Sequence, residues 1–275
     1  MDLDWNAWLT LLTRWVHIFA AILWVGTTYY FTWLDGRMSE QEKRGGAPGE
    51  GGAGGPQVWM VHSGGFYRVD KTKVFDTGHE LHWFQWEAAT TWLSGIVLLV
   101  LVYYQGGLMV DESVRELSNW QAIGIGVGVL VAGWVAYDAM MRSPLGRSET
   151  LAAAIGFGLI VLLSWGLSRW ISGRALYMHV GALFGTIMAN NVAQRIIPAQ
   201  RRMVAAVREG RTPDAALGAS AKLRSKQNTF LAVPVVFLMT SVHFPTISYG
   251  SRHGWIVLCA MVLLGWAAAR WIRRA

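Results

Sequence analysis

The chain has few charged residues and almost no cysteine, and each shortage excludes a class of protein. Only 15% of its 275 residues are charged, against about 25% in an ordinary soluble domain. The single cysteine, Cys259, excludes an internal disulfide and any CxxCH attachment site for c-type haem within this sequence. The first residues, MDLDWNAW, lack the basic region of a secretory signal peptide, and no small-residue cleavage site follows, so no cleaved leader is expected.

Hydrophobic residues make up 53% of the chain and are gathered in long runs. A helix needs about 20 apolar residues to cross a hydrocarbon core of about 30 Å. The runs therefore predict an all-α, polytopic membrane bundle of about seven transmembrane helices, which forms one integral-membrane domain over residues 1–275. The predicted spans are residues 8–34, 84–104, 120–141, 151–171, 177–197, 230–248 and 255–272.

The formal net charge of +7 reflects membrane topology. If the N-terminus is outside, most lysines and arginines fall in the segments predicted inside, after the first, third and fifth spans and at the chain end. This bias is the positive-inside rule, and it predicts the N-terminus outside and the C-terminus inside. The basic charge is thereby explained without nucleic acid, and membrane lipids are the expected surroundings.

Two inside segments are long enough to carry structure of their own. The first begins with GGAPGEGGAGGP, residues 45–56, which is typical of a flexible linker. The stretch after it, VWMVHSGGFYRVDK, mixes aromatics with His62, so we expect it to fold back against the inner face of the bundle. The second segment, residues 199–227, is basic and alanine-rich and predicts a cytoplasmic helical hairpin that turns at Thr212 and Pro213.

Three histidines fall in the outer half of the predicted bundle: His17, His179 and His243. Ionisable groups at membrane depth are rare and usually functional, and imidazole is a common axial ligand of haem iron in helical bundles. We predict a haem b with His17 and His179 as the iron ligands, His243 as a substitute ligand or proton relay, and Arg14 as a partner for a haem propionate. The alternative is that each histidine is a hydrogen-bonded core or interface residue.

A second polar cluster, GHELHWFQWE at residues 78–87, lies at the inner mouth of the second span. The Glu87 carboxylate, within reach of a histidine such as His82, could fix the imidazole tautomer for acid–base chemistry. The rings of Trp83 and Trp86 could stack on a flat heterocycle. The alternative is an interfacial belt, because tryptophan gathers at membrane surfaces without any ligand.

Long stretches of unusual composition resemble one known family. They are WMVHSGGFYRVDK (59–71), LHWFQWEAATTWLSG (81–95), AGWVAYDAMMRSPLG (132–146), MHVGALFGTIMANNV (178–192) and GRTPDAALGASAKLRSKQNTFLAVPVVFLMTSVHFP (210–245). Over nearly its whole length the chain resembles the membrane domain of the bacterial cytochrome c urate oxidases, which are integral-membrane urate hydroxylases. The resemblance implies oxidation of urate to 5-hydroxyisourate in the bacterial cytoplasmic membrane.

The family blocks include His62, His82, Glu87, Asn190 and Asn191. Together with the stacking argument above, the resemblance leads us to expect His62, His82 and Glu87 as catalytic residues, and Trp83, Trp86, Asn190 and Asn191 as substrate-binding residues. The sequence ends without the cytochrome domain of the family, so we expect electrons to pass to a separate c-type cytochrome or to other electron-transfer subunits. Two alternatives stay open: a non-catalytic subunit of a larger respiratory or photosynthetic complex, and a transporter for a flat anionic metabolite.

Overall fold

The computed structural model describes residues 4–44, 55–72 and 75–273, and these are mostly helical. The α-helices are α1 (Trp5–Lys43), α2 (Trp86–Leu98), α3 (Asn119–Arg142), α4 (Glu149–Leu167), α5 (Gly173–Asn190), α6 (Ile197–Arg208), α7 (Ala215–Ser241) and α8 (Gly254–Ile272). Two π-helical segments, η1 (Leu99–Tyr104) and η3 (Asn191–Ile196), extend α2 and join α5 to α6. Short 3-10 turns, η2 (Pro144–Arg147) and η4 (Pro245–Ile247), follow α3 and α7. Most of the glycine-rich linker predicted at 45–56 lies outside the described residues.

Five of the described helices are long and apolar enough to cross a membrane: α1, α2 with η1, α3, α4 and α8. The prediction of a helical protein suited to a membrane is confirmed at this level. The exact set of seven spans and their orientation stay predictions. The other two predicted spans correspond to α5 and α7, and α7 begins at Ala215, well before the predicted start at residue 230.

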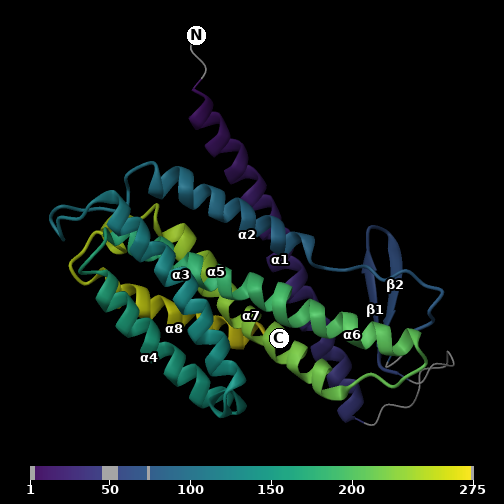
Figure 1. Cartoon of the computed structure of the whole chain (residues 1–275). Coiled ribbons are helices and arrows are strands. Elements are labelled where there is room, and N and C mark those ends of the chain that lie inside the picture. The colour runs from purple at the N-terminus through teal and green to yellow at the C-terminus, as the bar shows by residue number, and fades with distance from the viewer. Residues whose placement is uncertain (1–3, 45–54, 73–74, 274–275) are drawn as a thin grey trace.

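Helix α5 lies at the centre of the bundle and packs against α2, α3, α4, α7 and α8 (Figure 1). Several of its side chains, including Tyr177, His179 and Val180, are fully buried. Close approach of α3 depends on glycine: a Cβ added at Gly133 would lie 2.5 Å from Leu183 Cδ1. Because α5 contacts protein along most of its length, it can carry polar side chains that a lipid-facing helix could not.

Helix α1 packs mainly along α2, and its first half projects beyond the bundle (Figure 1). Large apolar side chains on this half, such as Trp15 and Phe19, are exposed, as expected of a face turned to lipid. The other end of α1 carries Leu34 and Met38, which are buried with Val58 in a small separate core.

The segment that contributes Val58 is a β-hairpin, so the all-α prediction needs correction here. Strands β1 (Gln57–His62) and β2 (Gly65–Asp70) pair antiparallel, from Gln57 opposite Asp70 to His62 opposite Gly65. The turn residues Ser63 and Gly64 have φ of 49° and 75°, which is the two-residue geometry that matches strand twist. Alternating aromatic and β-branched residues around this turn favour strands over helix. The hairpin packs against α1, and whether this is the inner face of the bundle stays a prediction.

Candidate functional site

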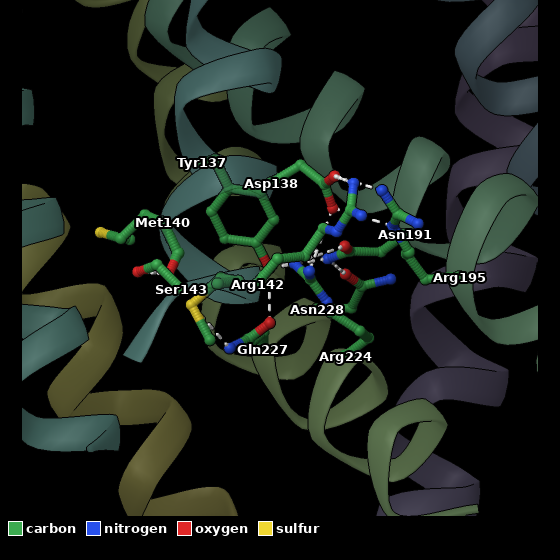
Figure 2. Close-up of polar contacts among 11 residues, drawn as sticks. Tyr137, Asp138, Met140, Arg142, Ser143, Asn191, Arg195, Arg224, Gln227 and Asn228 are labelled. Atoms are coloured by element: carbon green, nitrogen blue, oxygen red, sulfur yellow. Dashed lines mark hydrogen bonds and ion pairs between the residues drawn. The ribbon is translucent and has the colours of Figure 1, made fainter. Parts of the chain in front are cut away.

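Asp138, near the end of α3, is bound by arginines from two other elements (Figure 2). Arg195 of η3 donates from Nε to Oδ1 at 2.9 Å and from Nη2 to Oδ2. Arg224 of α7 donates from Nη2 to Oδ1 at 3.0 Å. Asp138 and Arg224 are only 8% and 4% exposed. Such charge-assisted hydrogen bonds are strong, and removal of one buried partner would leave an uncompensated charge. They therefore join α3, η3 and α7 at one end of the bundle.

Buried amide and hydroxyl groups extend this network from the arginines to Tyr137 and Asn228 (Figure 2). The fully buried Asn191 donates from Nδ2 to the Tyr137 hydroxyl at 3.0 Å and to Asn228 Oδ1 at 2.9 Å. Tyr137 in turn donates to Gln227 Oε1 at 2.5 Å, and the Arg224 guanidinium lies 5.2 Å from the Tyr137 ring centroid. We name these residues, with Asp138 and Arg195, the Asp138 network. Asn191 was expected to bind substrate, but its buried side chain is hydrogen-bonded within this network.

Sequence reasoning did not single out Asp138, Arg195 or Arg224. A signal for the first was present, since Asp138 is the carboxylate within an otherwise apolar predicted span, with Arg142 four residues later on the same helix face. Arg142 Nη1 does lie 3.9 Å from Asp138 Oδ2. The other two arginines come from distant segments, and their pairing is a tertiary contact without a local pattern.

A cavity of about 280 Å³ opens beside the start of α2, where α6 passes Trp83. It is lined by Trp83, Arg201, Val204, Ala205, Arg208 and Glu209. The half-buried Trp83 also packs against the core cluster that contains Trp24. The Arg201 guanidinium lies 5.9 Å from the Trp83 ring centroid. We call this the Trp83 pocket: it offers a flat aromatic face, positive charge from two arginines and one carboxylate.

The remaining residues predicted at the inner mouth are spread over its surface. His82 is exposed and packs edge-on against Phe84, with ring centroids 4.5 Å apart. Trp86 is 71% exposed. Glu87 is half-buried in the first turn of α2, and its carboxylate makes no hydrogen bond or ion pair with any described residue. His62 is exposed beside the hairpin turn, and no contact in the described chain joins it to the others.

Asn190, the other predicted substrate-binding amide, is used within its own helix. Its Nδ2 donates to the Thr186 carbonyl at 2.9 Å, and its Oδ1 accepts from Gln194 Nε2 at 2.6 Å. Thr186 is linked to α2, because Trp92 Nε1 donates to its hydroxyl at 3.1 Å. Both side-chain hydrogen bonds of Asn190 therefore stay within the continuous α5–η3 segment.

His179 is fully buried, and the hydrogen bonds of its ring fix its tautomer. Its Nδ1 lies 2.8 Å from the Ala175 carbonyl oxygen, which can only accept, so Nδ1 carries the proton. Nε2 is left with its lone pair and faces the Tyr104 hydroxyl at 3.3 Å. Gly126 of α3 closes the other side, where an added Cβ would lie 2.5 Å from Nε2. This is the tautomer in which histidine binds a metal through Nε2.

His17, on α1, also has its Nδ1 hydrogen-bonded to a backbone carbonyl. Its Nδ1 lies 2.9 Å from the Thr91 carbonyl oxygen and 3.1 Å from the Ser94 hydroxyl, and the ring is half-buried. Gly95 leaves room for the ring, since a Cβ there would lie 3.0 Å from Cε1 of His17. The Nε2 atom has no hydrogen-bond partner among the described residues.

The structure does not place the two rings face to face. His17 contacts α2 at Ser94 and His179 contacts it at Tyr104, positions that lie on the order of 15 Å apart along a helix. His243 is exposed just beyond the end of α7, and Arg14 is exposed on α1. The iron-ligand pair therefore stays a prediction, and so does the haem.

These features describe a mostly helical protein with several helices suited to a membrane, a buried ionic network at one end of the bundle and two histidines with fixed tautomers. The chain belongs to the urate oxidase N-terminal family, whose sequence pattern matches residues 4–274. The predicted resemblance to the urate oxidases is thereby confirmed at the level of the family. No curated protein and no solved structure matches the chain.

Proposed function

We propose that the chain is a membrane oxidoreductase of the urate hydroxylase type. Its family supports a urate-related function. In the proposed reaction urate and water give 5-hydroxyisourate, two protons and two electrons, and the electrons pass to a separate c-type cytochrome or another electron-transfer subunit. The bacterial cytoplasmic membrane is the proposed location.

The observation that carries this proposal is the pairing of Trp83 with Arg201 in the Trp83 pocket. Urate is a flat purine that is an anion at neutral pH. A tryptophan face stacks on flat rings, and a guanidinium offers planar donors and a fixed positive charge to an anionic edge. Arg208 adds a second charge and Glu209 an acceptor for a ring N–H. The cavity, at about 280 Å³, is close to the lower end of the ~300–1,000 Å³ range of ligand pockets.

Glu87 and His82 are the proposed acid–base residues. Glu87 follows Trp83 by one short turn of chain, and its carboxylate has no other partner in the described structure. A half-buried carboxylate without a cation is suited to accept a proton from urate or from the attacking water. His82 stands beside Trp83 in the chain and reaches solvent, so it can exchange that proton.

We also propose a haem b in the half of the bundle that holds His17 and His179. The Nδ1 of each ring is hydrogen-bonded to a backbone carbonyl, which leaves Nε2 unprotonated and is the tautomer of a haem ligand. In His17 this Nε2 has no hydrogen-bond partner among the described residues, whereas in His179 it faces the Tyr104 hydroxyl at 3.3 Å, a contact that an iron ligand would have to give up. When bound, haem would supply a one-electron carrier between the substrate and a cytochrome.

Binding of urate by the purified protein tests the substrate site. Trp83→Ala removes the stacking face and Arg201→Gln removes the paired charge, so each should weaken binding about tenfold. Arg202→Gln is the matched control, because Arg202 is an exposed neighbour on α6 that does not line the pocket. Equal urate affinity in wild type and the three variants would contradict the proposal that urate binds in the Trp83 pocket.

A second function is favoured by the exposure of α1. Only 6% of its apolar window is buried, against 22% to 28% in the other four candidate spans. Such a face suits contact with partner helices as well as lipid, as in a non-catalytic subunit of a respiratory or photosynthetic complex. Native purification discriminates between the two: stable partner subunits without urate turnover would favour the structural role.

A further inference from the structure

We propose that the β-hairpin is a membrane anchor, whose turn end dips into the headgroup layer of the bilayer that α1 crosses. The anchoring face carries Trp59, Val61 and Phe66, and the partner of this face is the lipid surface. The inference goes beyond the proposed oxidoreductase and depends only on helices that are suited to a membrane. It gives a role to a segment that neither the Trp83 pocket nor the Asp138 network uses.

The outward face of the hairpin is apolar and exposed. Residues that pair directly across two strands lie on the same face, and Val61 pairs with Phe66 next to the pair of Trp59 with Arg68. The exposed fraction is 65% for Trp59, 72% for Val61 and 82% for Phe66. These three side chains therefore form one apolar surface. The opposite face packs on α1 through Val58, Met60 and Val69.

Contacts with the second half of α1 fix the direction in which the hairpin points (Figure 1). At its open end, Gln57 exchanges two hydrogen bonds with Gln41, at 2.8 and 3.0 Å. Nearer the turn, the Tyr30 hydroxyl donates to Met60 Sδ at 3.3 Å. Gln41 and Tyr30 lie about three helical turns apart. Strand β1 therefore runs back from the polar end of α1, residues 35–43, toward the apolar part of the helix.

The turn end of the hairpin approaches a cluster of exposed aromatic residues. Tyr30, Phe31 and Trp33 are exposed on α1, and the Phe31 ring meets the Phe84 ring at 4.9 Å, which joins α1 to the chain just before α2. Trp86, in the first turn of α2, is also exposed. Aromatic side chains gather in such belts at the boundary between membrane and water. The outward face of the hairpin continues this belt beyond the helices.

The open end of the hairpin is polar and is held by ion pairs. Lys71 Nζ lies 2.9 Å from Asp35 and 3.6 Å from Glu42, both on α1. Lys222 of α7 lies 2.7 Å from the other carboxylate oxygen of Asp35. These pairs fix the hairpin against two helices at the end that faces water. The change from a charged open end to an apolar turn end is typical of an element that enters the membrane interface from water.

A lipid surface fits this face better than a protein partner does. Each partner in a specific protein interface contributes ~800 Å², more than three side chains supply by themselves. A bilayer requires no matching shape, and tryptophan and phenylalanine are residues that bury well at its surface. The Arg68 guanidinium lies 5.9 Å from the Trp59 ring centroid and its side chain is 45% exposed. It can therefore donate to a lipid phosphate while the indole beside it is buried.

Fluorescent labels along the hairpin test the anchor in the full chain, reconstituted in lipid nanodiscs. The buried native thiol is removed by Cys259→Ala, and single labels are placed by Phe66→Cys, Trp59→Cys and Asp70→Cys. Asp70 is the matched control, because it is exposed on the same face at the open end. Nitroxide lipids should quench the label most at Phe66, less at Trp59 and least at Asp70. Iodide in the water should quench in the reverse order, at least about threefold more at Asp70 than at Phe66, because about 13 Å of strand separates them.

Two results would overturn the anchor. Equal iodide quenching at Phe66 and Asp70 would place the whole face in water. Protection of Phe66 from iodide without quenching by nitroxide lipids would mean that protein covers the face, either a second copy of the chain or another partner. Val61→Cys, on the paired residue, repeats the measurement if the label at Phe66 disturbs the fold. The test uses neither urate nor haem, so its result is independent of the proposed function.

Discussion

Arg224 donates to Asp138 across 3.0 Å, and both side chains are almost fully buried. Replacing Asp138 with asparagine should therefore lower the free energy of unfolding by about 3 kcal/mol, because an unpaired buried guanidinium remains. Denaturant unfolding in detergent measures this effect. Asp70→Asn breaks an exposed pair with Arg68 and should cost less than about 1 kcal/mol. Equal losses in the two variants would contradict a structural role for the Asp138 network.

Gly126 and Gly128 lie two residues apart on α3, and we expect alanine to have opposite effects on stability at these two positions. A Cβ at Gly126 would lie 2.5 Å from His179 Nε2, whereas nothing lies within 4 Å of one at Gly128. Gly126→Ala should cost about 1–3 kcal/mol through overpacking, and Gly128→Ala should be neutral or slightly stabilising because alanine favours helix. Thermal unfolding of both variants in one detergent distinguishes them. A harmless Gly126→Ala would mean that His179 does not lie against α3.

Glu87 is expected to carry a proton in the reaction. Glu87→Gln should lower kcat by about 10²–10⁴ with little change in KM, since the amide keeps the shape and loses the base. Steady-state urate oxidation over a range of pH measures both constants. Glu80→Gln changes an exposed carboxylate nearby and is the control. A fall in kcat of similar size in both variants would assign the loss to the local fold.

The β-hairpin is attached to α1 partly through Lys71, whose Nζ lies 2.9 Å from Asp35. Burial acts to lower the pKa of Lys71, but the hydrogen bond and the charge of Asp35 outweigh it and raise the pKa above its ordinary 10.5. A raised pKa means that the pair stabilises the attachment below pH 10.5 and is lost as the pH rises through the folded pKa. The rate of amide hydrogen exchange in residues 57–70, corrected for the intrinsic effect of pH on exchange, should therefore rise as the pH passes the folded pKa of Lys71. Lys71→Met should already show this exchange at neutral pH.

The helices were predictable because a hydrophobic run of membrane length leaves the backbone few other options. The hairpin at 57–70 was not, although the Ser63–Gly64 turn between alternating residues was a usable local signal. The pairing of Asp138 with Arg195 and Arg224 joins residues from three segments, and no local pattern encodes it. The depths of His17 and His179 in the membrane could be estimated only roughly, by counting residues from the ends of the predicted spans. The distance between the positions on α2 that they contact depends on how α1 crosses the bundle, which the sequence does not specify.

The central claim is that this chain oxidises urate at the Trp83 pocket. Its most direct test is urate-dependent reduction of a c-type cytochrome by the protein in liposomes, compared among wild type, Arg201→Gln and Arg202→Gln. We expect turnover in wild type and Arg202→Gln, and a KM about tenfold higher in Arg201→Gln because the pocket loses its paired charge. Absence of urate oxidation in wild type supplied with haem and cytochrome, or identical kinetics in all three proteins, would contradict it.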